Sequence, residues 1–157
     1  MHLLSILCLI LAFSMTVAGK EWRGIVPLHS TRNDVERLFG LSFYGGGYAY
    51  EFENERVFFQ YQYPDNECGR VYEQWNVLLN TVIEVTVYPK NKILFSSLTL
   101  EISKFKETKI HIPGSYRYFN EEEGVSYAVD KGVVAQISYR PSANDKHLAC
   151  PKETKHG

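Results

Sequence analysis

The sequence predicts an α+β fold, in which an antiparallel, twisted sheet of about five to seven strands carries a short N-terminal helix on one face. Two observations lead to this prediction. Several short segments rich in Val, Tyr and Phe alternate between apolar and polar residues, as strands with one buried face do. One segment near the front of the chain, residues 32–39, instead spaces its apolar residues as a helix does.

The helix predicted at residues 32–39 has signals at both ends. Ser30 or Thr31 can cap its first amide groups, and Thr31 together with Asp34 approximates a capping box. Gly40 is suited to the C-terminal cap. The apolar residues form one stripe: Val35, Leu38 and Phe39. A helix this short is not stable alone, so we expect it to pack against the sheet.

The predicted strands are recognised by period-two alternation and by turn residues at their ends. Two pairs of strands read as hairpins, one turning at Asn54 and Glu55 and the other at Asp130–Gly132. Residues 103–112 fit either an irregular loop or a short helix. The strands are expected at residues 48–53, 56–63, 81–88, 98–102, 116–119, 126–129 and 133–139.

The first residues predict a leader rather than part of the fold. The apolar run Leu3–Phe13 is too short to span a bilayer and has the length of a signal-peptide core. Small residues at its end place cleavage after Ala18 or Gly19. The alternative is an uncleaved N-terminal anchor, because no Lys or Arg precedes the run. We therefore expect a signal peptide at 1–18, one secreted domain at 19–150 and a flexible polar tail at 151–157.

Loss of the leader would remove Cys8 and leave two cysteines, Cys68 and Cys150. In an exported protein such a pair predicts a disulfide, which would stabilise the fold by about 4 kcal/mol. The alternatives are separate thiols or part of a zinc site, although neither cysteine has a close C-x-x-C partner. The predicted strands that end at Tyr63 and Tyr139 are each followed by a Pro, polar residues and a cysteine. This similarity indicates either an internal repeat or a chance match.

Several segments resemble a group of secreted bacterial proteins that have no assigned activity. The resemblance covers nearly all of the chain after the leader and implies no catalytic residues. It is carried by the opening Trp22–Gly40 and by four later segments: Trp75–Val77, Thr81–Lys90, Glu123–Gly124 and His147–Cys150.

The S-T-x-x-D-V-x-x-L-F-G pattern within Ser30–Gly40 is also similar to envelope proteins of the SmpA/OmlA type and to β-lactamase-inhibitor-like domains. In those families short helices at this motif pack on an antiparallel sheet that binds another protein. They often place two such helices in sequence, whereas this chain passes from Gly40 to a strand at Tyr48.

Composition excludes some classes of partner. The 17 Lys and Arg and 18 Asp and Glu give a net charge of −1, so the chain lacks the basic surface of a nucleic-acid-binding protein. It also has no long basic stretch for an anionic membrane. The aromatic content is high at 14%, with 11 Tyr and 9 Phe, which fits both a strand-rich core and a recognition surface.

None of the candidate chemical motifs is complete. Gly45–Gly47 leads into a strand without the Lys of a phosphate loop, and Glu121–Glu123 reads as a solvated turn rather than as a facing carboxylate pair. His29, Ser30 and Asp34 lack the elbow of a catalytic triad. We therefore expect no catalytic residue, no metal site and no cofactor.

The chain is predicted to be an exported, non-enzymatic binding or protein-interaction module, either secreted or periplasmic. Its partner would be a protein or glycan of the envelope or the medium. The alternatives are an envelope structural or assembly factor and an extracellular hydrolase with an unrecognised site. Trp22 and Trp75 fit either core or binding positions. Aromatic and Arg side chains dominate binding hot spots, so the candidate binding residues are Trp22, Arg32, Arg37, Tyr48, Tyr50 and Trp75.

Overall fold

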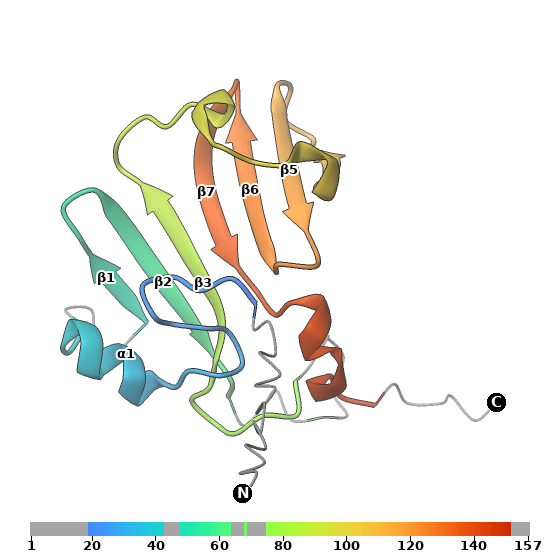
Figure 1. Cartoon of the computed structure of the whole chain (residues 1–157). Coiled ribbons are helices and arrows are strands. Elements are labelled where there is room, and N and C mark those ends of the chain that lie inside the picture. Colours follow the sequence, from blue (N-terminus) through green and yellow to red (C-terminus); the bar gives the residue numbers. More distant parts are fainter. Residues whose placement is uncertain (1–18, 43–47, 64–67, 69–74, 152–157) are drawn as a thin grey trace, which may run out of the picture.

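Seven strands of the described residues form one open antiparallel sheet in the order β1-β2-β3-β7-β6-β5-β4 (Figure 1). The computed structural model describes residues 19–42, 48–63, 68 and 75–151, so the predicted signal peptide and all but the first residue of the predicted tail lie outside them. The elements are α1 (Arg32–Phe39), β1 (Ala49–Glu51), β2 (Glu55–Tyr61), β3 (Val82–Pro89), β4 (Lys106–Lys109), β5 (Ser115–Asn120), β6 (Val125–Asp130) and β7 (Val133–Tyr139). The predicted α+β class is confirmed.

Helix α1 begins and ends where the sequence predicts. Thr31 and Asp34 form a complete capping box, in which the Thr31 backbone N–H donates to the Asp34 carboxylate at 2.9 Å. At the other end the Gly40 N–H donates to the Glu36 carbonyl at 2.8 Å. The hydrogen bonds from Thr31 hold the pKa of Asp34 below its ordinary value, with a smaller contribution from Arg37. The capping residues therefore fix the helix bounds locally.

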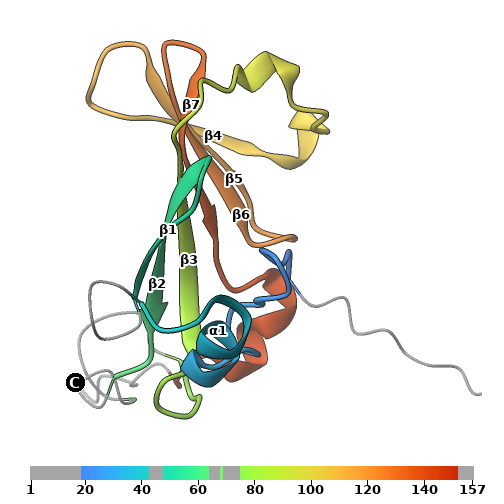
Figure 2. The same cartoon turned by 90° about the vertical axis from the view of Figure 1, so that its left-hand side faces the viewer.

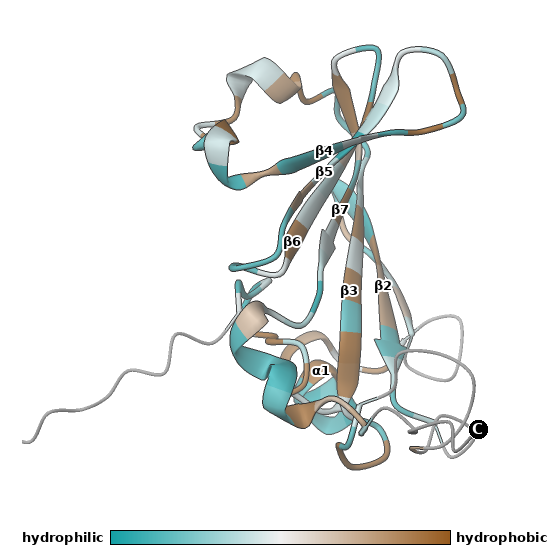
Figure 3. Cartoon of the chain, turned by 90° about the vertical axis from the view of Figure 1, so that its right-hand side faces the viewer, coloured by the Kyte–Doolittle hydropathy of each residue, from teal (hydrophilic) through white to brown (hydrophobic). Residues whose placement is uncertain are grey.

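Only one face of the sheet is covered by the described helices. Along β2, Val57, Phe59 and Tyr61 are buried, whereas Arg56 and Phe58 are exposed. Figure 3 shows β3 mainly brown with a teal band, and in β2 the consecutive Phe58 and Phe59 are both apolar although only Phe59 is buried. Viewed along the sheet, α1 and the 3₁₀ helices lie to one side (Figure 2). We call that side the covered face and the opposite side the uncovered face.

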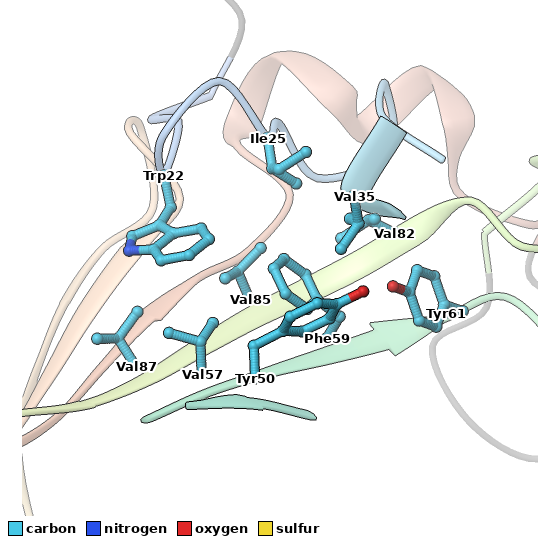
Figure 4. Close-up of a cluster of buried hydrophobic side chains, with 10 residues drawn as sticks. All are labelled: Trp22, Ile25, Val35, Tyr50, Val57, Phe59, Tyr61, Val82, Val85 and Val87. Carbon is cyan, nitrogen blue, oxygen red and sulfur yellow. The ribbon is translucent and has the colours of Figure 1, made fainter. Parts of the chain in front are cut away.

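The N-terminal segment and α1 cover β1, β2 and β3. Figure 4 shows Trp22, Ile25 and Val35 pointing down onto the strands. The ring centroids of Trp22 and Phe59 lie 5.7 Å apart in an edge-to-face arrangement. Such aromatic pairs add to the stabilisation that burial alone provides. The side chains beneath them form a contiguous buried cluster: Tyr50, Val57, Phe59, Tyr61, Val82, Val85 and Val87.

Arg23 closes the outer side of this cluster. It lies in a two-residue turn whose ends are joined by reciprocal hydrogen bonds between Trp22 and Ile25. Its guanidinium carbon lies 5.1 Å from the Trp22 ring centroid and 4.8 Å from that of Phe52. The same group pairs with the Glu55 carboxylate at 2.6 Å. A cation over two aromatic faces and beside a carboxylate stabilises the turn against the sheet.

A second segment, residues 93–105, covers β5, β6 and β7. The strand predicted at residues 98–102 is wrong. Leu98 and Leu100 pack onto a cluster that contains Tyr127, and the chain around them forms 3₁₀ helices at Phe95–Ser97 and Ile102–Lys104. Alternating leucines indicate that one side of a segment is buried. An irregular segment that crosses the face of a sheet also buries one side, so the pattern did not require a strand. The edge strand β4 occupies part of the stretch where the sequence fits a loop or a short helix.

The C-terminal segment is held at the lower end of the sheet. Cys68 and Cys150 form a disulfide with 5.3 Å between their Cα atoms, which is the pairing that the sequence predicts. Beside it, Trp75 forms an isolated β-bridge with Ala149. The strands before the two cysteines, β2 and β7, flank β3 on opposite sides. If the two strands occupied equivalent registers, Tyr139 and Tyr63 would lie opposite the same β3 residue. Instead, Val85 of β3 pairs with Tyr139 on one side and with Phe59 on the other.

Replacing both bridging cysteines, Cys68→Ser with Cys150→Ser, should lower the free energy of unfolding by about 4 kcal/mol. The reason is that the bridge joins residues 82 positions apart and restricts the unfolded chain. Chemical denaturation of the oxidised protein and the double variant measures the difference. Equal unfolding midpoints, or two thiols that alkylate without denaturant, would contradict the prediction.

Gly124→Ala should destabilise the fold by about 3 kcal/mol or more. Gly124 has a φ of +66°, and an added Cβ would lie 2.2 Å from the Arg140 carbonyl oxygen, where the backbone has no room to yield. Gly132→Ala is the matched control: its φ is +79°, but no other atom lies within 4 Å of the added Cβ. Thermal unfolding should therefore show a much smaller loss for Gly132→Ala, and equal losses would refute the steric argument.

Candidate functional site

Five side chains at the upper end of β1, β2 and β3 form a distinct group on the uncovered face. Glu51, Arg56 and Tyr88 face one another in register across the three strands. Phe58 follows Arg56, and Lys90 follows Tyr88, by two residues, so alternation brings them to the same side. We call this group the aromatic patch: Glu51, Arg56, Phe58, Tyr88 and Lys90.

The rings of Phe58 and Tyr88 are the apolar part of the patch. Their centroids lie 5.7 Å apart with planes at 88°, an edge-to-face pair between neighbouring strands. Phe58 is 37% exposed and Tyr88 is 40% exposed. Tyr88 lies one residue beyond Val87, the last β3 residue paired with β7, so no β7 residue is in register beside it. The pair stabilises the strands but leaves aromatic surface in contact with water.

Charged groups flank the rings. The Glu51 carboxylate accepts a hydrogen bond from the Arg56 guanidinium and pairs with the Lys90 ammonium at 3.0 Å. Lys90 also donates to the Phe52 carbonyl at 2.5 Å, which fixes its position. The hydrogen bonds from Lys90 and Arg56 hold the pKa of Glu51 below its ordinary value. One acceptor group and two donor groups are therefore held in place beside the aromatic pair.

An open hollow of about 520 Å³ lies against this group and is lined by Arg56, Phe58, Tyr88, Pro89 and Lys90. Small-ligand sites in proteins typically enclose about 300 to 1,000 Å³ and combine apolar walls with a few placed polar groups. The described lining residues are two aromatic side chains, two cationic side chains and one proline. The arrangement is suited to binding a ligand between ring faces and charged groups.

A second group joins the N-terminal segment to the C-terminal 3₁₀ helix at Ala143–Leu148. His29 Nε2 lies 2.8 Å from Asp145 Oδ1, and the buried carboxylate also accepts from the Ser142 N–H and hydroxyl, both at 2.7 Å. Burial alone would raise the pKa of Asp145, but the hydrogen bonds from Ser142 and His29 outweigh it and hold that pKa below its ordinary value. Ser142 donates to Asp145 and is itself buried, so the three residues do not form a nucleophile–base pair.

The structure distributes the predicted binding residues over several places. Trp22 and Tyr50 are buried in the core cluster. The Arg32 guanidinium lies 4.8 Å from the Tyr61 ring centroid, and Arg37 pairs with Asp34 at 2.7 Å on the surface of α1. Tyr48 is 45% exposed, whereas Trp75 is half-buried beside the disulfide. None of the six lines the hollow at the aromatic patch.

The sequence does contain a signal for the aromatic patch. In β2 the buried residues Val57, Phe59 and Tyr61 set the phase, and Phe58 is an aromatic residue in the opposite, exposed phase. Tyr88 has the same relation to Val85 and Val87 in β3. Two aromatics out of phase in strands that pair with each other indicate a surface site. Only the register between β2 and β3 shows that the two rings touch.

Comparison with protein-family models, with curated proteins and with solved structures finds no match to this chain. Among the described residues, no cluster of three or more His, Cys, Asp or Glu side chains is arranged to hold a metal ion. Within the same part of the chain, no helix has the length and apolar character of a membrane span. Gly45–Gly47 lies outside the described residues. The aromatic patch is therefore the candidate functional site among the described residues.

His29→Ala should lower the free energy of unfolding by about 1 to 2 kcal/mol near neutral pH, because it removes one hydrogen bond to a buried carboxylate. The pKa of Asp145 is depressed in the folded protein, so the ionised carboxylate adds to the free energy of unfolding. This stabilisation is present above about pH 4 and is lost as the pH falls through the depressed pKa. The two proteins should therefore converge in strong acid. Denaturation at a series of pH values measures this.

His147→Ala is the matched control for that experiment. His147 is exposed, and its Nδ1 lies 2.9 Å from the backbone carbonyl of Asn144 rather than from a carboxylate. The change should alter stability by no more than about 0.5 kcal/mol. A His147 effect as large as the His29 effect, or a His29 effect that does not depend on pH, would show that the His29–Asp145 contact is not responsible.

Proposed function

We propose that this protein is a non-enzymatic binding module that acts outside the cytoplasm and holds its ligand at the aromatic patch. The observation that carries the proposal is the exposed Phe58–Tyr88 ring pair, beside the hydrogen-bonded charges of Glu51, Arg56 and Lys90. Aromatic and Arg side chains supply much of the binding energy in protein recognition sites. Four of the five patch residues lie in the paired strands β1, β2 and β3, so the backbone that carries them is already ordered before a ligand binds.

Location outside the cytoplasm is supported by the bridge between Cys68 and Cys150. Disulfides persist mainly in oxidising compartments, such as the periplasm and the medium. The apolar run at the start of the sequence, read as a signal peptide, supports the same location. A binding module in these compartments would work on proteins or glycans of the envelope or the medium.

Replacing both rings, Phe58→Ala with Tyr88→Ala, should reduce ligand retention by at least about tenfold, because the variant loses both aromatic contact surfaces. The oxidised protein and the variant are immobilised and exposed to envelope extract and culture medium of the source cells. Bound material is quantified by mass spectrometry and by sugar analysis. Unfolding midpoints measured in parallel separate a loss of binding from a loss of folding.

Tyr48→Ala is the control, since Tyr48 is exposed to a similar degree but shares the Tyr50 side of the sheet. It should retain ligand as the unmodified protein does. Equal retention by all three proteins would refute the proposed site. Release of chemically altered material from the bound fraction would instead identify an enzyme.

A further inference from the structure

We infer that the ligand of the aromatic patch is a saccharide, whose pyranose ring stacks on the Phe58–Tyr88 pair while its hydroxyls bind Glu51, Arg56 and Lys90. This inference rests on the proposed function and adds the chemical class of the ligand. Its basis is the chemistry of the rings, the mixture of donors and acceptors, and the extent of the patch.

The ring pair is suited to a ligand with a flat, weakly positive C–H surface. An aromatic ring carries partial negative charge on its faces and partial positive charge on its edge. In the edge-to-face pair of Phe58 and Tyr88, the edge of one ring contacts the face of the other. Both rings stay more than a third exposed, which leaves ring surface for a ligand. A pyranose ring presents several C–H groups on one side, which pack favourably on such a face.

The polar groups match hydroxyls better than they match a single charge. A carboxylate only accepts hydrogen bonds, whereas guanidinium and ammonium groups only donate them. Glu51 contributes the acceptor, and Arg56 and Lys90 contribute the donors, within one connected group. A sugar hydroxyl both donates and accepts, so neighbouring hydroxyls can bind both kinds of group. Charge-assisted hydrogen bonds of this type are about twice as strong as neutral ones.

The extent of the patch favours a small ring ligand over a protein. A stable protein interface takes about 20 to 30 residues from each partner, whereas the hollow that the described patch residues line has a volume of about 520 Å³, within the range of small-ligand sites. Across the strands from Phe58, the paired residues on the uncovered face are Thr86 in β3, Ser138 in β7 and Ser126 in β6. Ser138 is 3% exposed and Ser126 is 8% exposed, so these small side chains offer little surface for anchoring a protein.

The test measures binding of the oxidised protein to defined oligosaccharides: cellohexaose, chitohexaose and hexagalacturonate. We expect saturable binding to at least one of them by isothermal titration calorimetry. Phe58→Ala and Tyr88→Ala should each weaken it by at least about tenfold, whereas Tyr88→Phe keeps the ring and should stay within about threefold. Glu51→Ala should also weaken binding by about tenfold through loss of the hydroxyl acceptor. Tyr48→Ala, on the opposite face, should bind as the unmodified protein does.

The outcomes separate this inference from the proposed function. No binding to any of the three oligosaccharides, together with a protein retained from extract in a Phe58- and Tyr88-dependent way, overturns the saccharide and leaves the binding module standing. Oligosaccharide binding that Phe58→Ala and Tyr88→Ala leave unchanged overturns the patch as its site. If Phe58→Ala and Tyr88→Ala reduce neither the retention of protein from extract nor the binding of oligosaccharide, both the saccharide inference and the proposed function are overturned.

Discussion

The structure depends on shielding one face of a single open sheet with chain that does not belong to the sheet. Alternation sends every second side chain of a strand to each face, and one sheet has no second sheet to cover its apolar side. Residues 19–39 cover β1 to β3 through Trp22 and Ile25, and residues 93–105 cover β5 to β7. Ile137 and Tyr139 on β7 contact both clusters and join them into one continuous core.

One-sided covering also explains where a binding surface is available. Because the N-terminal segment, α1 and the 3₁₀ helices lie on the same side of the sheet, none of these described elements covers the opposite face of β2 and β3, which carries Phe58 and Tyr88 (Figure 2). Exposed aromatic rings that meet on a sheet face form a contiguous apolar surface of the kind that interaction sites use. The edge-to-face contact between the two rings recovers part of that free energy. The remaining ring surface is the physical basis for assigning a ligand to this face.

The C-terminal segment is held at one end of the sheet by contacts of different kinds, two of them to the middle of the chain and one to the N-terminal segment. The disulfide at Cys150 is covalent, the bridge between Trp75 and Ala149 uses backbone groups, and the contact between His29 and Asp145 joins charged or polar side chains. Their combination lets a short 3₁₀ helix hold its position without a large apolar face of its own. The His29–Asp145 contact also joins the covering N-terminal segment to this helix.

The sequence alone determined the helix at residues 32–39, six of the seven strands and the partnership of Cys68 with Cys150, because capping, alternation and cysteine count are properties of a few residues or of composition. Only the tertiary structure decided that β3 lies between β2 and β7, that Leu98 and Leu100 cover the sheet instead of joining it, and that Phe58 meets Tyr88. These outcomes depend on strand register and on packing between distant segments. Local periodicity assigns a side chain to a face, but it does not specify which other residue lies beside it.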